Sequence, residues 1–252
     1  MRFVVAGIFV LMLNSLAIAE TPLEANSSME QVLDALHARG QGLKDFTADV
    51  SLAETDALSG ETTTMTGKVW YQARGEGDAR MRIIFDKKLF GNRPQAGAKV
   101  EYVLDEGWLT DRDYKRKVQI RRQVLKPGEK VNLLKLGEGP FPLPIGQPRE
   151  EVLKLFDVKK IEAKQGDPEG TVHLELAPKE KTQFARKFKK IDVSVETKTS
   201  FPRRIATVDK SEAEMRQTDL TNIQVNVGLK DEAFVQEKLG EGWTQKEEQM
   251  DQ

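Results

Sequence analysis

The sequence predicts a mainly β protein with short helices, in which one antiparallel sheet curves strongly into an incomplete barrel under a helical lid. Three observations lead to this prediction. Apolar and polar residues alternate with period 2 in segment after segment, as in strands that bury one face. The breaks between these segments are short and rich in turn-forming residues. Helical spacing is confined to a few short segments, which disfavours a parallel α/β fold.

Residues 1–19 have the layout of a cleaved secretory signal peptide. Arg2 is followed by an apolar segment from Phe3 to Leu13, and Ala17-Ile18-Ala19 supplies small residues for cleavage. A membrane anchor needs about 18 apolar residues, and polar residues interrupt this run after Leu13. The chain has no Cys, which excludes disulfides and the lipidated cysteine of a bacterial lipoprotein. We expect a soluble, exported, periplasmic protein.

The rest of the chain is expected to form one domain, residues 20–243, followed by a disordered polar tail, 244–252. The 39 basic and 40 acidic residues are mixed along the chain, so we expect no nucleic-acid partner, and we expect a monomer. Residues 112–122 and 179–190 are locally basic. We interpret them as solvated faces, and the alternative is a surface for anionic lipid or an acidic partner.

The first helix is predicted from Ser28 onward, because Ser-x-x-Gln is a capping-box pattern. Val32, Leu33 and Leu36 then repeat at helical spacing, and Gly40 is expected to stop the helix. The apolar stripe of this helix is predicted to cover the sheet that begins at residues 46–52. The other segments predicted as strands are 62–72, 80–86, the three-piece meander 100–120, 171–177, 191–196, 205–208 and 214–227.

Residues 137–146 are the least ordinary loop, because Pro and Gly are frequent while apolar residues persist at alternate positions. Pro148 is then expected in the first turn of a second helix that ends near Asp157. Loop and helix together could be a movable cover over an apolar opening. The alternative is an extended segment packed across a core.

The sequence offers few groups for catalysis. His37 and His173 are the two histidines, and both are interpreted as structural residues on a helix face and on the polar face of a strand. The absence of Cys excludes thiolate metal sites and Cys nucleophiles. No nucleophile elbow, phosphate loop or dinucleotide fingerprint occurs. We therefore expect no catalytic residue, no metal and no cofactor.

Apolar surface in excess of these needs predicts a hydrophobic ligand. Each methylene moved from water into an apolar site contributes about 0.8 kcal/mol, so an acyl chain needs no specific hydrogen bond. The alternative is a fully packed core. The residues predicted to line or back the cavity are Val50, Leu52, Met65, Val69, Tyr71, Met81, Ile83, Phe85, Tyr102, Leu104, Val193 and Val195. The residues predicted to cover it are Leu33, Leu36, Phe141, Leu143, Val152 and Phe156.

Five segments keep a fixed order along the chain: LKDFTADV (43–50), GKVWY (67–71), YVLDEGWL (102–109), LELAPK (174–179) and DLTNI (219–223) with Phe234. In this order they resemble the periplasmic carriers of outer-membrane lipoproteins, the LolA type, and their LolB relatives. GKVWY resembles the Gly-x-Leu-Trp strand of this family, and YVLDEGWL resembles its Asp-Gly-x-x-Leu-Trp hairpin. The resemblance extends over most of the chain after residue 19.

The resemblance implies a carrier that shields the acyl chains of lipoproteins or related lipids and meets transport partners at the inner and outer membranes. It also implies an arginine that helps to hold the lid shut. Arg74 is the nearest counterpart, although Gly75 replaces the proline that follows this arginine in the family. Two other functions stay open: a periplasmic lipid- or protein-sensing module of the same fold without transfer activity, and a carboxylate-based hydrolase.

Overall fold

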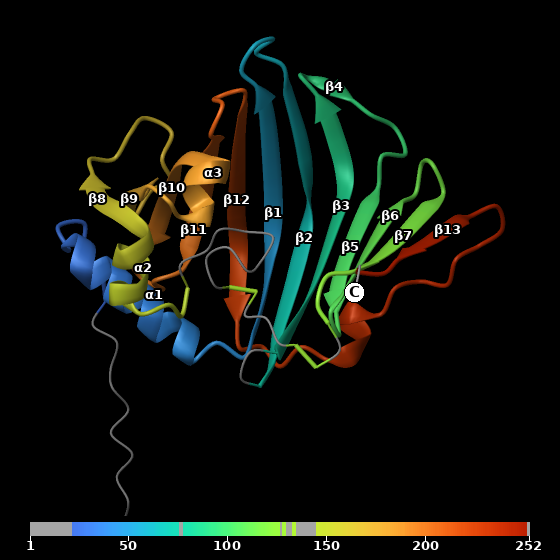
Figure 1. Cartoon of the computed structure of the whole chain (residues 1–252), viewed down its shortest axis with the longest axis horizontal. Coiled ribbons are helices and arrows are strands. Elements are labelled where there is room, and N and C mark those ends of the chain that lie inside the picture. Colours follow the sequence, from blue (N-terminus) through green and yellow to red (C-terminus); the bar gives the residue numbers. More distant parts are fainter. Residues whose placement is uncertain (1–21, 76–77, 127, 130–132, 135–144, 251–252) are drawn as a thin grey trace, which may run out of the picture.

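The computed structural model describes residues 22–75, 78–126, 128–129, 133–134 and 145–250 (Figure 1). The predicted signal peptide lies outside these residues. The described helices are α1 (Met29–Gln41), α2 (Arg149–Leu155) and α3 (Gln183–Lys187), with a 3-10 turn, η1, at Asp231–Phe234. The described strands are β1 (Asp45–Asp56), β2 (Thr62–Gly75), β3 (Asp78–Phe90), β4 (Arg93–Pro94), β5 (Val100–Asp105), β6 (Trp108–Asp113), β7 (Val118–Gln123), β8 (Phe156–Ile161), β9 (Thr171–Pro178), β10 (Phe188–Glu196), β11 (Pro202–Asp209), β12 (Glu214–Val225) and β13 (Thr244–Glu248).

The described strands form one sheet in the order β13-β7-β6-β5-β3-β2-β1-β12-β11-β10-β9-β8, with β4 paired to β3. Because β13 and β8 stand at opposite ends of this order, the sheet is open. Figure 1 shows it curling across the molecule, with the three helices gathered near the end formed by β8 to β11. The predicted fold class is confirmed: a mainly β chain with short helices and one curled sheet that does not close into a barrel.

Strands β1, β2 and β3 are long because their apolar and polar residues keep the period of 2 over many residues. Phe46 pairs with Tyr71 and Ala48 with Val69, so the apolar side chains of β1 and β2 share one face. We call this face, with its cross-strand neighbours, the inner face, and the opposite one the outer face. Gly67 is required on β2, because a Cβ atom there would lie 1.8 Å from the carbonyl oxygen of Ile84.

Helix α1 begins with the predicted capping box. The Ser28 hydroxyl accepts the Gln31 amide N–H, and the Gln31 side chain accepts the Ser28 N–H. Gly40 does not stop the helix, which continues to Gln41. Its function is close packing: a Cβ on Gly40 would lie 2.2 Å from the Cα atom of Gly146. A glycine therefore lets the segment before α2 approach the α1 backbone.

Helix α2 differs slightly from its prediction. Pro148 is the N-cap residue, the helix ends at Leu155, and Phe156 begins strand β8. Neither β8 nor α3 was predicted. Strand β8 alternates poorly because Lys159 and Lys160 are both exposed, and α3 has only five residues within a basic run.

The prediction of a disordered tail is wrong for Thr244–Glu248, which forms β13 and pairs in parallel with β7. All five residues of β13 are exposed, so the strand has no apolar face and leaves no alternation in the sequence. Main-chain hydrogen bonds to a sheet edge form without apolar side chains. No helix among the described residues combines the length and apolar character needed to cross a bilayer.

Candidate functional site

The inner face of the sheet carries the main apolar cluster of the described residues. Under α1 and α2 this cluster is packed: Val193 and Val195 on β10 have 0% exposure. Leu33 and Leu36 from α1, Val152 from α2 and Phe156 at the start of β8 are equally buried in it. We call this part the packed half. Two residues predicted as cavity lining and four predicted as lid therefore meet here in one packed core.

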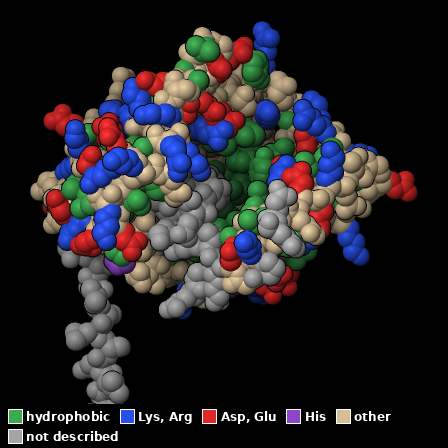
Figure 2. Space-filling model, in the orientation of Figure 1, with side chains coloured by type: hydrophobic (Ala, Val, Ile, Leu, Met, Phe, Trp, Pro, Cys, Tyr) green, Lys and Arg blue, Asp and Glu red, His purple; other side chains and the backbone are tan. Residues whose placement is uncertain are grey.

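The part of the inner face on β1, β2, β3 and β5 is less completely covered, and we call it the open half. Leu52, Met65, Tyr102 and Leu104, all predicted as cavity residues, are partly exposed and pack against the core cluster. The same strands carry six buried residues of the predicted set: Val50, Val69, Tyr71, Met81, Ile83 and Phe85. Figure 2 shows a hollow with hydrophobic side chains over this part of the sheet. The open half is the candidate ligand-binding face.

Two aromatic pairs form part of the apolar surface of the inner face. Phe46 stacks on Tyr71 with ring centroids 5.3 Å apart, and Phe85 meets Tyr102 edge to face at 6.5 Å. Burial raises the pKa of the Tyr71 hydroxyl to about 12. Burial, with the nearby Asp111 carboxylate, also raises the pKa of Tyr102. Both tyrosines are therefore neutral and present mainly apolar ring surface.

The apolar face ends at a charged border on β6 and β7. Asp111 pairs with Tyr102 across the ladder, so its side chain lies on the inner face. Its carboxylate is 3.8 Å from the Arg122 guanidinium. Partial burial raises the pKa of Asp111, an effect that Arg122 opposes and Asp113 reinforces. A ligand that covers the open half would meet the charged groups of Asp111 and Arg122 at this edge.

The segment that precedes α2 is attached to α1. The amide of Gly146 donates to the Leu36 carbonyl oxygen at 3.0 Å, and His37 Nδ1 lies 3.0 Å from the Gly146 carbonyl oxygen. Ile145 is fully buried beside them. His37 thus holds this segment, in agreement with a structural role. The predicted lid residues Phe141 and Leu143 lie outside the described residues.

Arg74 lies at the end of β2, where it joins two turns. Its guanidinium is 2.6 Å from Asp105 and 3.3 Å from Asp78. It borders a pocket of about 340 Å³ that Leu104 and Leu125 also line. Both ion-pair partners come from ends of strands, and the role of Arg74 as a lid latch stays a prediction.

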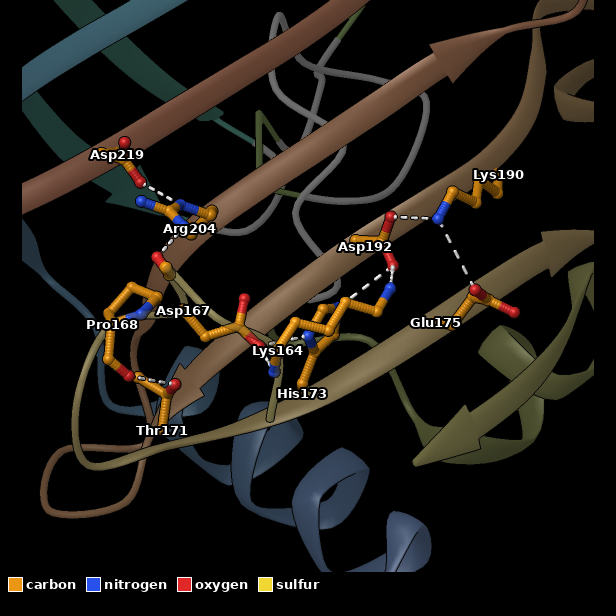
Figure 3. A network of polar contacts seen from close by, with 11 residues as sticks. Lys164, Asp167, Pro168, Thr171, His173, Glu175, Lys190, Asp192, Arg204 and Asp219 are labelled. Atoms are coloured by element: carbon orange, nitrogen blue, oxygen red, sulfur yellow. Dashed lines mark hydrogen bonds and ion pairs between the residues drawn. The ribbon is translucent and has the colours of Figure 1, made fainter. Parts of the chain in front are cut away.

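His173 lies on the outer face of β9, as the alternation predicts, but it is buried, with 6% exposure. Figure 3 shows its ring between two aspartates: Nδ1 is 2.8 Å from Asp167 and Nε2 is 3.0 Å from Asp192. Carboxylates accept hydrogen bonds, so this geometry fits a ring protonated on both nitrogens. Burial alone lowers the pKa of His173, but the hydrogen bonds and charges of Asp192 and Asp167 outweigh it and raise that pKa.

The charged ring has a structural consequence. Asp167 belongs to the loop between β8 and β9, whereas Asp192 is on β10. Lys190 lies 2.8 Å from Asp192, so this aspartate forms ion pairs with both Lys190 and His173. Both nitrogens of His173 are engaged with carboxylates, which ties the loop to the sheet and leaves no free nitrogen to act as a base.

Some residues of the candidate site were not in the predicted set. Val100 and Ala73 are partly buried against the same cluster, and Leu133 and Leu134 are buried in it. Val100 alternates with Tyr102 and Leu104, and this period would have identified it. Leu133 and Leu134 lie between Gly- and Pro-rich stretches, where no regular period indicates which side chains turn inward.

No protein-family profile matches the chain, and no curated protein matches it. Solved structures with a similar fold include a DUF1329 family protein from Desulfovibrio piger, with 14% identity, a TM-score of 0.41, and coverage of 81% of this chain and 95% of that one. A chain of the Pseudomonas aeruginosa MucA/MucB complex has 11% identity and a TM-score of 0.45 over 82% of this chain, which spans 60% of that one.

A LolA superfamily protein from Nitrosomonas europaea has 10% identity and a TM-score of 0.31, with coverage of 83% of this chain and 98% of that one. The predicted resemblance to LolA-type proteins is confirmed as a structural similarity at low sequence identity. Neither family membership nor an activity of this chain follows from matches with these scores.

Proposed function

We propose that the chain is a non-enzymatic periplasmic carrier that shields the acyl chains of lipoproteins or related lipids on the open half of the inner face, for delivery to the outer membrane. The observation that supports this proposal is the contrast between the two halves of one apolar face. Val193 and Val195 are fully covered in the packed half, whereas Leu52, Met65, Tyr102 and Leu104 keep partial exposure on β1, β2 and β5.

The physical chemistry of the open half suits an alkyl chain. Roughly ten methylenes moved onto this face would contribute about 8 kcal/mol before the costs of association and ordering are subtracted. The side chains that would contact the bound alkyl chain are aliphatic or are neutral tyrosine rings. Such a surface favours hydrocarbon without selecting a particular head group.

A pair of neighbouring substitutions tests the proposal. Leu52 and Ser51 are adjacent on β1, and their side chains point to the inner and outer faces. Leu52→Glu places a carboxylate against the proposed acyl site, whereas Ser51→Glu places the same charge on the outer face. We expect Leu52→Glu to weaken binding of a fluorescent fatty acid at least tenfold, or about 1.4 kcal/mol, and Ser51→Glu to leave binding within twofold.

Met65→Glu provides an independent check, because Met65 is the cross-strand partner of Leu52. Circular dichroism should show that all three variants are folded. Equal affinities for the inner-face and outer-face variants would contradict the proposal. Transfer of a bound lipoprotein from the protein to acceptor vesicles separates a carrier from a sensor of the same fold, since a sensor would retain its ligand.

A further inference from the structure

The outer face is crossed by the chain after β12. The Asp45 carboxylate accepts the amide N–H groups of Val227 and Gly228 at 2.8 and 3.1 Å. Gln72 then donates to the carbonyl oxygen of Leu229 at 2.8 Å. We call residues 226–238 the strap. These contacts turn the chain away from β12 and direct it across β3 and β5.

Three arginines of the outer face hold the strap, and two of them, Arg80 and Arg112, are buried. Arg82 donates to the carbonyl oxygen of Ala233 at 2.9 Å, and Arg112 donates to that of Glu237 at 2.7 Å. Arg80 lies over the ring of Phe234 at 4.2 Å, and that ring is only 5% exposed. The strap is thus anchored by buried and largely buried groups.

The chain beyond the strap is held differently. Gly242 has a positive φ of 79°, and Trp243 meets Tyr114 edge to face at 5.3 Å. Strand β13 follows, and all its residues are exposed. Two ion pairs join its side chains to β7, Arg121–Glu247 at 2.9 Å and Arg122–Glu248 at 2.7 Å.

These contacts are weak in energy. Exposed ion pairs contribute roughly 0.2–1 kcal/mol each, and their four side chains are 38–51% exposed. The β13–β7 ladder is parallel, whereas the other described ladders are antiparallel, and parallel pairing is slightly less stable per residue. Strand β13 therefore covers the edge of β7 without burying apolar surface.

The edge beneath β13 has a defined charge. Strand β7 contributes Arg121 and Arg122, and the turn before it contributes Lys115, Arg116 and Lys117, all three exposed. The segment that lies on this edge ends in two glutamates, Glu247 and Glu248. The basic cluster in residues 112–122 thus faces an acidic extended segment of its own chain.

We propose that the edge of β7 is a docking site for an acidic, extended segment of a partner polypeptide, which takes the place of β13. The partner would supply main-chain hydrogen bonds to β7 and carboxylates to Arg121 and Arg122, as in other cases of strand addition at a sheet edge. The strap stays in place during this exchange, because its buried anchors lie before Gly242. This proposal does not depend on the apolar ligand of the inner face.

The test uses the full chain and a fluorescent peptide with the sequence of residues 243–250. In the unaltered chain, β13 competes as an intramolecular ligand at an effective concentration on the order of mM. Lys246→Pro removes one N–H from β13, because alternate residues donate in a parallel ladder and Thr244 donates to Lys117. Gln249→Pro, just beyond β13, is the matched control.

Fluorescence anisotropy should show that the Lys246→Pro chain binds the peptide at least tenfold more tightly than either the unaltered chain or the Gln249→Pro chain. A peptide with both glutamates changed to lysine should bind at least tenfold more weakly. Equal affinity for the three chains, or for the two peptides, would overturn the proposal. A dimer of the unaltered chain that the peptide dissociates would assign the edge to a second copy and overturn the assignment to a different partner.

Hydrogen exchange on the unaltered chain gives a second test that requires no variant. Excess peptide should increase exchange in residues 244–248 and leave the strap and β12 unchanged. Unchanged exchange in residues 244–248 at saturating peptide would contradict replacement of β13.

Discussion

Raising the pH should destabilise the protein through one histidine. The pKa of His173 is raised in the folded protein, because the hydrogen bonds and charges of Asp192 and Asp167 outweigh its burial. Its stabilising contribution is therefore complete below the ordinary histidine pKa of about 6.5. That contribution is lost as the pH rises through the higher pKa of the folded state.

The size of this effect follows from proton linkage. Between the ordinary and the raised pKa, the folded protein binds up to one more proton at His173 than the unfolded chain does. The free energy of unfolding should then fall by up to about 1.4 kcal/mol for each pH unit. His173→Gln removes the charged ring from two largely buried carboxylates and should cost about 3 kcal/mol at pH 6, at the lower end of values for a broken buried ion pair.

The acid side has the opposite sign. Burial alone would raise the pKa of Asp192, but hydrogen bonds from His173 and Lys190 lower it. The pKa of Asp167 is lowered as well, through hydrogen bonds from the Lys164 amide and His173 against the effect of burial. Their contribution is complete above the ordinary aspartate pKa of about 3.9 and is lost as the pH falls through the lowered values.

Urea unfolding followed by circular dichroism between pH 2 and pH 9 measures both effects. The unaltered chain should lose stability above pH 6.5, and His173→Gln should remove most of this slope. His37→Gln is the matched control, because His37 contacts a carbonyl oxygen instead of a carboxylate. An alkaline slope that is the same in His173→Gln and in the unaltered chain would refute the reasoning.

Three further substitutions test separate parts of the structure. Gly40→Ala should destabilise the protein by about 1–3 kcal/mol in urea unfolding, because its Cβ would lie 2.2 Å from Gly146, whereas Gly42→Ala, with open space around its Cβ, should be neutral. Glu101→Gln should cost about 3 kcal/mol in the same assay, since Glu101 is 0% exposed and accepts from Arg82 at 2.7 Å; a loss no larger than about 1 kcal/mol would contradict a buried ion pair. If Arg74 latches a lid, Arg74→Gln should speed the release of a bound fluorescent fatty acid in stopped-flow measurements, and unchanged release would contradict the latch.

The sequence was sufficient for those elements that bury one face. The alternation of Phe46, Ala48 and Val50, and that of Val100, Tyr102 and Leu104, reflects side chains that point to opposite faces of a sheet. The capping box at Ser28 was equally recognisable in the sequence, because it depends on residues that are three positions apart. Local chemistry and period were enough in these places.

Elements that bury little left no such signal. Strand β13 has five exposed residues, and its existence depends on the distant edge of β7. The same limit applies to His173, whose outward direction was predictable from β9. Its burial depends on the loop that carries Asp167, and no local pattern shows where that loop folds back.

The candidate site was predictable as a face but not as an opening. Leu52 and Val193 both alternate as inward residues, yet Val193 is fully covered and Leu52 is partly exposed. The difference depends on where α1 and α2 lie, which is a property of the tertiary structure. The period of a strand identifies a side of the sheet and carries no information about what covers it.

The most direct test of acyl binding is photo-cross-linking with a fatty acid that carries a diazirine on its alkyl chain. Mass spectrometry of the purified full chain should locate the adducts on residues of the open half, above all Leu52, Met65, Tyr102 and Leu104. Competition with unlabelled fatty acid should remove them. Adducts on the outer face, for example at Trp70 or Ile84, or adducts that competition does not reduce, would contradict the central claim.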